Sequence, residues 1–157
     1  MAETKCFRHL LLKPMYKMTK SVKILSAALG VMMLLPGLAK FTEPFKTFIY
    51  QHLTIIGFPF PEVMQYVVKF SEIGVGLSLI FITFYGKELS KTLLNKIFYA
   101  NNLAVFSMMV VAIYTHLHPG VPAEILPVEF KPPVMPVVYI LLVLLNVYFY
   151  RFTSSKK

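Results

Sequence analysis

The 157-residue sequence has no tryptophan and no aspartate, and it contains a single cysteine, Cys6. One cysteine cannot form an internal disulfide or a CxxC pair, so this chain alone offers no dithiol chemistry. The absence of aspartate rules out a Ser-His-Asp triad, and neither an HExxH motif nor a P-loop occurs. The familiar sequence motifs of serine hydrolases, zinc peptidases and nucleotide-binding proteins are therefore missing.

Charged residues are also scarce, at 15% of the chain, whereas hydrophobic residues make up 57%. Soluble domains carry about 25% charged residues. The mean hydropathy of +0.66 points in the same direction. This composition excludes a disordered chain, a coiled coil and a disulfide scaffold, and its length fits one domain. It predicts a membrane protein.

Four apolar segments have the length that a helix needs to cross a bilayer, about 20 residues. They cover residues 24–41, 63–86, 97–115 and 132–150. None alternates with a period of two, so β-strands are not expected. The sequence predicts an all-α, transmembrane four-helix bundle over residues 24–152, with a basic segment before it (1–23) and a basic tail after it (153–157).

The distribution of lysine and arginine predicts the orientation of this bundle. Twelve of the 16 basic residues fall on one side of the predicted membrane, in segments 1–23, 87–96 and 151–157. Cytoplasmic loops of membrane proteins are enriched in such residues, so both termini are expected in the cytoplasm. The net charge of +9 is then a topology signal, and no nucleic-acid partner is expected.

The two outer loops are rich in proline, whereas the inner loop is short and charged. Eight of the eleven prolines lie in or beside the two outer loops: Pro44, Pro59, Pro61, Pro119, Pro122, Pro127, Pro132 and Pro133. Within the first outer loop, apolar residues from Phe45 to Ile56 recur at helical spacing. This pattern predicts a short helix in the outer membrane interface.

Glu72 is the most informative residue, because a carboxylate deep in a span must be neutral, paired or facing water. Lys69 is three residues earlier on the same helical face, and Lys40 at the end of the first span is a second candidate partner. One hypothesis is a structural ion pair that orients the helices. The other is a carboxylate that handles protons or faces a ligand, with Lys69 as a further catalytic candidate.

The third span carries Asn101 and Asn102, with Asn102 at a depth similar to that of Glu72. An amide inside a membrane needs a hydrogen-bond partner, and a carboxyl across the bundle would provide one. Asn102 is therefore a candidate ligand-binding residue. The alternative is that both amides only hold helices together.

His116 and His118 end the third span, just before Pro119. A His-x-His pair can bind a metal from extended backbone, and Glu124 and Glu129 could complete such a site. On a helix the two rings would point in opposite directions, and hydrogen bonding at the interface is then the expected role. His116 is a candidate ligand-binding residue, and both histidines are metal candidates.

Several of these segments resemble the DoxX-like family of integral membrane proteins. The similar features are Gly-Leu-Ala-Lys-Phe at 37–41, which closes the first span, and Glu-Ile-Gly-Val-Gly-Leu at 72–77. A third span that ends in histidine, followed by a proline-rich outer loop, is similar too. The resemblance covers residues 24–149. It implies a four-helix protein of the bacterial inner membrane, with Lys40, Glu72 and the histidine at the end of the third span as positions of interest.

The residues and the resemblance together leave three functional hypotheses. The first is a small membrane subunit of a quinone-linked or thiol and oxidative-stress redox complex, with a quinone near Glu72, Lys69 and Asn102. The second is a non-catalytic accessory protein that docks a protein partner through its outer loops. The third is a small proton-coupled exporter that uses one membrane glutamate and acts as a homo-oligomer, namely a homodimer. Family resemblance alone does not make the chain an enzyme.

Overall fold

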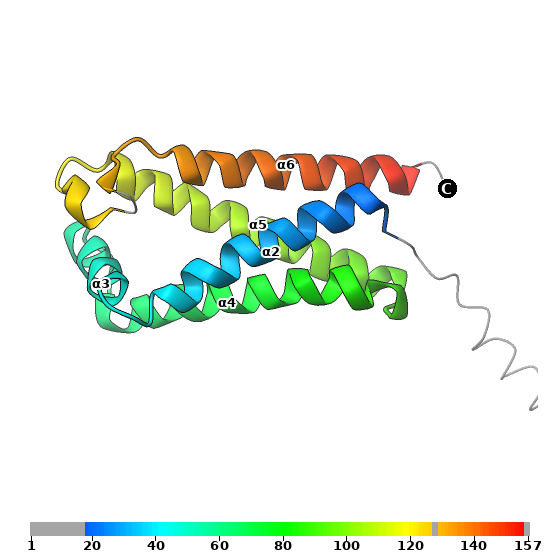
Figure 1. Cartoon of the computed structure of the whole chain (residues 1–157), viewed down its shortest axis with the longest axis horizontal. Helices are drawn as coiled ribbons and strands as arrows, with labels where there is room; N and C mark the ends of the chain where they lie inside the picture. The colour runs from blue at the N-terminus through cyan, green and yellow to red at the C-terminus, as the bar shows by residue number, and fades with distance from the viewer. Residues whose placement is uncertain (1–17, 127–128, 156–157) are drawn as a thin grey trace, which may run out of the picture.

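A computed structural model describes residues 18–126 and 129–155. Within these residues the chain is all-helical and contains no strand, as the sequence predicted. The elements in order are α2 (Lys20–Ala39), α3 (Phe45–Ile55), α4 (Pro61–Tyr85), η1 (Gly86–Glu88), α5 (Lys91–Leu117), η2 (Ala123–Ile125) and α6 (Val134–Ser155). Helices α2, α4, α5 and α6 form an elongated bundle, and α3 lies across one end of it (Figure 1).

Four helices are long and apolar enough to cross a membrane, and they correspond to the four predicted spans. Their ends differ by several residues from the predicted ends. Helix α5 begins at Lys91, six residues before the apolar segment, because the Ser90 hydroxyl accepts a hydrogen bond from the Leu93 amide at 3.3 Å and caps the helix. Helix α2 likewise begins at Lys20. A helix continues through polar residues that hydropathy alone leaves out.

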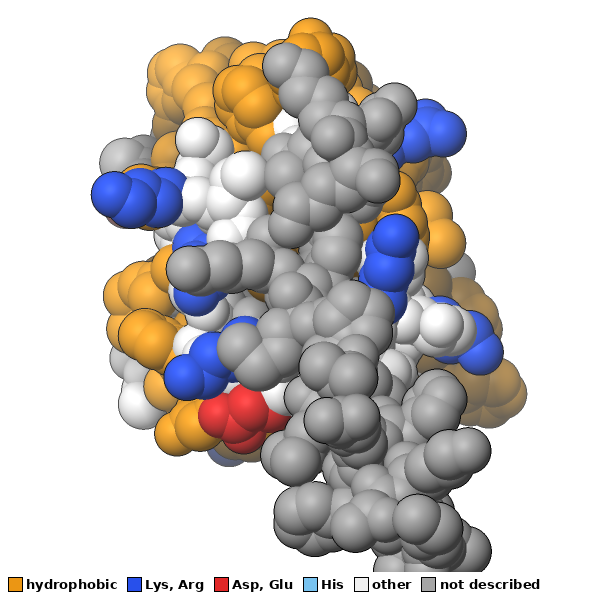
Figure 2. Space-filling model, turned by 90° about the vertical axis from the view of Figure 1, so that its right-hand side faces the viewer, with side chains coloured by type: hydrophobic (Ala, Val, Ile, Leu, Met, Phe, Trp, Pro, Cys, Tyr) orange, Lys and Arg blue, Asp and Glu red, His pale blue; other side chains and the backbone are white. Residues whose placement is uncertain are grey.

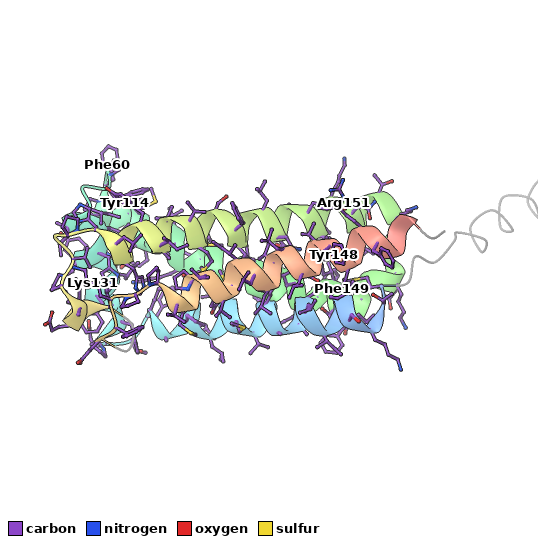
Figure 3. All side chains as sticks on the ribbon, turned by 90° about the horizontal axis from the view of Figure 1, so that it is seen from above. Phe60, Tyr114, Lys131, Tyr148, Phe149 and Arg151 are labelled. Atoms are coloured by element: carbon purple, nitrogen blue, oxygen red, sulfur yellow. The ribbon has the colours of Figure 1, made fainter. Side chains whose placement is uncertain are left out.

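The outer surface of the bundle is apolar, which is the reverse of a soluble helical protein. On α4, for example, Phe70 is 62% exposed and Phe84 is 65% exposed. Exposed aromatic side chains occur at both ends, with Phe60 and Tyr114 near α3 and Tyr148 near the opposite end (Figure 3). Tyrosine is enriched at both membrane interfaces. Soluble monomeric proteins rarely expose so large a continuous apolar surface, because its contact with water is unfavourable. This surface is suited to contact with a lipid bilayer.

Helices α2 and α4 pack so closely that glycine is required where they cross. A Cβ atom on Gly76 would lie 2.8 Å from the carbonyl oxygen of Gly30 and 2.8 Å from the amide nitrogen of Leu34. A Cβ atom on Gly37 would lie 3.0 Å from the Cβ atom of Glu72 and 3.2 Å from the amide nitrogen of Ile73. Small residues allow this backbone contact in lipid, where van der Waals packing drives association. This close packing brings the end of α2 against Glu72.

The two ends of the bundle differ in charge. The end remote from α3 contains the start of α2, the α4–α5 connection and the end of α6 (Figure 1). Figure 2 looks onto this end and shows lysine and arginine side chains around it. The basic residues in these segments and in the first two turns of α5 are Lys20, Lys23, Lys87, Lys91, Lys96 and Arg151. The end that carries α3 is the one at which the sequence places the proline-rich loops.

Candidate functional site

Glu72 forms an ion pair with Lys40, the second of the two partners considered from the sequence. Lys40 is the C-terminal cap of α2, and its Nζ donates to Glu72 Oε1 at 2.7 Å and to Oε2 at 2.5 Å. The Glu72 side chain is 9% exposed and that of Lys40 is 21% exposed. The close approach of Gly37 to Glu72 places the last turn of α2, and with it Lys40, beside the carboxylate.

Two cavities meet at this ion pair, in the half of the bundle nearest α3. Their volumes are about 530 Å³ and 340 Å³. Five residues line both cavities: Lys40, Glu72, Met109, Ala112 and His116. The remaining walls are mostly apolar. Binding sites for small molecules commonly combine such walls with a few polar groups that fix the orientation of the ligand.

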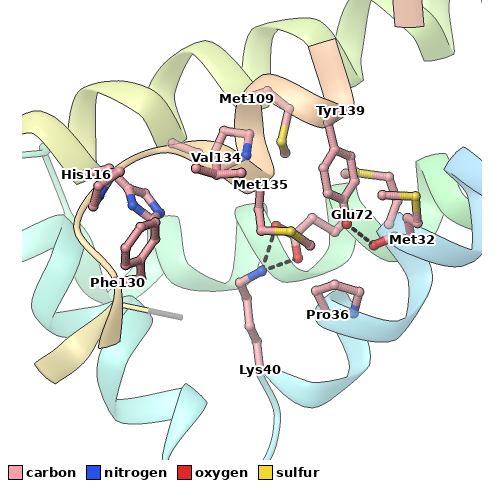
Figure 4. A pocket seen from close by; sticks show the side chains of 14 residues that line it. Met32, Pro36, Lys40, Glu72, Met109, His116, Phe130, Val134, Met135 and Tyr139 are labelled. Atoms are coloured by element: carbon pink, nitrogen blue, oxygen red, sulfur yellow. Dashed lines mark hydrogen bonds and ion pairs between the residues drawn. The ribbon is translucent and has the colours of Figure 1, made fainter. Parts of the chain in front are cut away.

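The larger cavity lies between α2, α5 and the start of α6 (Figure 4). Three of its lining residues, Phe130, Val134 and Met135, are more than half exposed, so the cavity opens on the side of the bundle. One turn after Met135 on α6, the Tyr139 hydroxyl donates a hydrogen bond to the carbonyl oxygen of Met32 at 2.5 Å and joins α6 to α2. The side opening faces the surface that is suited to lipid.

The smaller cavity lies beneath α3 and η2. Ile49, His52 and Leu53 of α3 form one wall, and Leu126 lies beside them. The His52 ring, through Nε2, bonds to the carbonyl oxygen of Ile125 at 2.7 Å and ties α3 to η2. We call α3 and η2 together the outer cover. Sequence reasoning missed His52 because this residue lies outside the four apolar segments.

His116 lines both cavities. It is 7% exposed, and its Nδ1 bonds to the carbonyl oxygen of Lys131 at 3.2 Å. A carbonyl can only accept, so Nδ1 carries the proton and Nε2 is an acceptor whenever the ring is neutral. The structure therefore brings together three candidates named from the sequence: Lys40, Glu72 and His116.

Lys69 is not part of this group. Its Nζ donates to Gln65 Oε1 at 3.0 Å and lies over the rings of Tyr66 and Phe41, at 4.9 and 5.3 Å from their centroids. The side chain is 1% exposed and lines neither cavity. The aromatic rings thus cover its charge, and the ion pair that sequence spacing allowed between Lys69 and Glu72 is replaced by the pair with Lys40.

Asn102 also lies apart from Glu72. Its Nδ2 donates to the carbonyl oxygen of Phe98 at 2.8 Å, and its Oδ1 accepts from Asn146 at 3.2 Å. Asn146 also donates to the Ser26 hydroxyl at 3.1 Å. The partner of Asn102 across the bundle is therefore another amide, not the expected carboxyl. These hydrogen bonds join α5, α6 and α2 without reaching the cavities.

The two metal candidates use their Nδ1 atoms for hydrogen bonds to backbone. The His118 Nδ1 accepts from the Gly120 amide at 3.2 Å, and its ring contacts Tyr114. Among the described residues there is no group of three or more histidine, cysteine, aspartate or glutamate side chains that could hold a metal ion. Hydrogen bonding to loop backbone is the role that the structure gives these two rings.

Methionines gather around the cavities, a feature that the sequence did not indicate. Six of the seven methionines in the described part of the chain line one cavity or both: Met32, Met33, Met64, Met108, Met109 and Met135. The seventh, Met18, is buried in the hydrophobic core. Methionine side chains are flexible and polarisable, so such walls adapt to ligands of different shape.

The outer cover should weaken in acid, because burial lowers the pKa of His52 below its ordinary value of 6.5. The unfolded chain then binds this proton more tightly than the folded one, so the stability that His52 contributes is lost as the pH falls below 6.5. We expect a lower apparent melting temperature at pH 5.5 than at pH 8. The His52→Gln variant keeps a hydrogen-bond donor and should show a smaller decrease. An equal decrease in both proteins would contradict this prediction.

The site thus consists of a charged pair and an imidazole at the junction of two largely apolar cavities. Such a site can bind a lipophilic molecule and hold its polar group by hydrogen bonds. Its carboxylate and imidazole can also take up or release protons. Comparisons with models of known protein families, with curated proteins and with solved structures find no match for this chain.

Proposed function

We propose that the chain is an integral membrane protein that binds the headgroup of a lipophilic, quinone-type molecule in the half of the bundle nearest α3. The observation that carries the proposal is the position of Lys40, Glu72 and His116, which line both cavities. The side opening at Val134 and Met135 gives a bilayer-dissolved molecule a direct route to these polar groups.

Each polar group has a chemical role in this proposal. Reduction of a quinone takes up two electrons and two protons. The Lys40 ammonium would donate a hydrogen bond to a quinone oxygen, and Glu72 and His116 would supply or accept protons. The chain has one cysteine and so no dithiol pair of its own, and we assign the electrons to a redox centre of a partner protein. This makes the chain a membrane subunit of a redox complex, as its resemblance to DoxX-like proteins suggests.

We further propose that the basic end of the bundle faces the cytoplasm and that α3 lies in the outer interface, as in a bacterial inner-membrane protein. The positive-inside rule supports this orientation, because Lys20, Lys23 and Lys87 are among the basic residues at that end. On α3, Phe45 is 43% exposed and Tyr50 is 37% exposed. These rings would lie at the level of the lipid headgroups.

A second candidate function is that of an accessory protein that docks a partner through the outer cover. The observation in its favour is that the two parts of the cover, α3 and η2, are joined to each other by the hydrogen bond from His52 to Ile125. A preformed surface loses little conformational entropy when a partner binds. In this case the Lys40–Glu72 pair would be structural.

Mass spectrometry of the tagged protein, purified from its native membrane in mild detergent, tests the main proposal. We expect quinone to co-purify in stoichiometric amount with the wild type and to be lost from Glu72→Gln. Polypeptides in the same sample would identify a redox partner. Glu62→Gln is the matched control, because Glu62 is an exposed glutamate in the first turn of the same helix.

Two further results decide between the candidates. Equal amounts of quinone in the wild type and in Glu72→Gln would contradict the quinone site. Absence of quinone from the wild type would contradict it as well. A co-purifying protein that both variants retain, with no quinone in either, would favour the accessory function. Size-exclusion chromatography and circular dichroism establish that each variant is folded.

A further inference from the structure

The four long helices form a ring, so each side of the bundle is bounded by two neighbouring helices. Helix α2 packs mainly against α4 and α6, and α5 also packs mainly against α4 and α6. The α2–α6 side and the α4–α5 side therefore lie opposite each other. A cavity that opens on one of these sides is reached from a different part of the bilayer than a cavity that opens on the other.

The larger cavity opens on the α2–α6 side. Its exposed lining residues include Pro36 of α2 and Val134 and Met135 of α6. These side chains are apolar. A lipophilic molecule that is dissolved in the bilayer can therefore enter here without leaving apolar surroundings.

The smaller cavity opens on the α4–α5 side. Its lining includes Met64 and Val68 of α4, which are half-buried, and Ser107 and Val111 of α5, which are exposed. Because the outer cover lies over this cavity, the way out of it is sideways, past Ser107 and Val111. This second opening also faces the surface that is suited to lipid, and its Ser107 hydroxyl can form a hydrogen bond with a polar group that passes it.

Both cavities lead to the same polar groups. Lys40, Glu72 and His116 line each of them, and so does Ala112 of α5. A ligand that enters from either side therefore meets the same ammonium, carboxylate and imidazole.

We propose that the Lys40–Glu72–His116 site takes up its ligand from the bilayer through two openings, on opposite sides of the bundle. The ligand is a lipophilic molecule with a polar headgroup, and its apolar chain lies in the opening through which it entered. A molecule whose chain fills one opening leaves the other free for a second molecule to approach the same groups. This inference rests on the proposed function, because it assumes that the cavities hold a lipophilic ligand.

Cysteine labelling in lipid vesicles tests the two openings separately. In a Cys6→Ser background, Ala112→Cys places a thiol at a residue that lines both cavities. The probe is an N-alkylmaleimide that partitions into the bilayer. Val134→Trp obstructs the α2–α6 opening, and Ser107→Trp obstructs the α4–α5 opening. We expect each tryptophan alone to slow labelling about two- to fivefold, because the other route remains, and both together to slow it about tenfold or more.

Val137→Trp and Val110→Trp are the matched controls. Each lies on the same helix as one of the obstructing residues, is exposed and lines neither cavity. Both should leave the labelling rate unchanged, and size-exclusion chromatography establishes that each variant is folded.

Two results would overturn the proposal. If one obstruction slows labelling as much as the pair does, the site has a single opening. If the pair slows labelling no more than the controls do, the thiol is reached by neither opening. The probe is not a quinone, so failure of the quinone assignment is detected separately, by the co-purification experiment.

Discussion

Gly76→Ala is expected to destabilise the bundle by about 2–3 kcal/mol and to lower its apparent melting temperature by roughly 5–10 °C. The new Cβ atom would lie 2.8 Å from two backbone atoms of α2, and backbone cannot rotate away as a side chain can. Helices α2 and α4 must therefore separate, which also moves Lys40 away from Glu72. Thermal unfolding in detergent, followed by size-exclusion chromatography, measures the change.

Gly74→Ala is the matched control for this substitution. Gly74 is two residues earlier on the same helix, and a Cβ atom there would meet nothing within 4 Å. We expect a melting temperature close to that of the wild type, since alanine is the better helix former. Equal destabilisation by the two substitutions would show that the helix crossing does not depend on contact at Gly76.

Lys40→Ala is expected to cost about 2–3 kcal/mol, which is less than the loss of one partner from a fully buried ion pair because Lys40 is partly exposed. The substitution leaves the Glu72 carboxylate buried without its ammonium. Glu72→Gln should cost less, since the freed Lys40 side chain can reach the membrane interface. The free energy of unfolding of each variant, measured in the same detergent, gives this comparison.

The Lys40→Met/Glu72→Gln double variant separates the charge effect from packing. It removes both charges and retains the volume of the side chains, so we expect it to be more stable than Lys40→Ala. A double-mutant cycle built from Lys40→Met, Glu72→Gln and this double variant gives the coupling between the two residues. A coupling near zero would contradict a stabilising ion pair, and equal costs for Lys40→Ala and Glu72→Gln would contradict the expected asymmetry.

The sequence predicted the helical bundle because span length and hydropathy are local properties. An apolar segment of about 20 residues must satisfy its backbone hydrogen bonds internally in lipid, and a helix does so wherever its neighbours lie. The short helix after the first span was likewise predicted from the spacing of Phe45, Phe48 and Leu53, and α3 covers these residues. The ends of α2 and α5 were less well predicted, since caps such as Ser90 depend on single side chains.

The candidate site could be predicted only in part. Glu72 stood out because a carboxylate inside a span needs a partner, and the sequence alone shows that the carboxylate lies inside a span. The choice between Lys69 and Lys40 was not visible, because it depends on where α2 crosses α4. Likewise, Gly74 and Gly76 are equivalent in sequence, yet only Gly76 faces the backbone of α2.

The sequence by itself therefore determined the class of protein, the four apolar helices and the residues that a membrane interior makes costly. Only the tertiary structure decided that Lys40 pairs with Glu72, that aromatic rings cover Lys69 and that Asn102 bonds to Asn146. It also decided that the ion pair and His116 line the same two cavities. The physical reason is that burial cost is a property of each residue, whereas pairing depends on the crossing and rotation of helices that are distant in sequence.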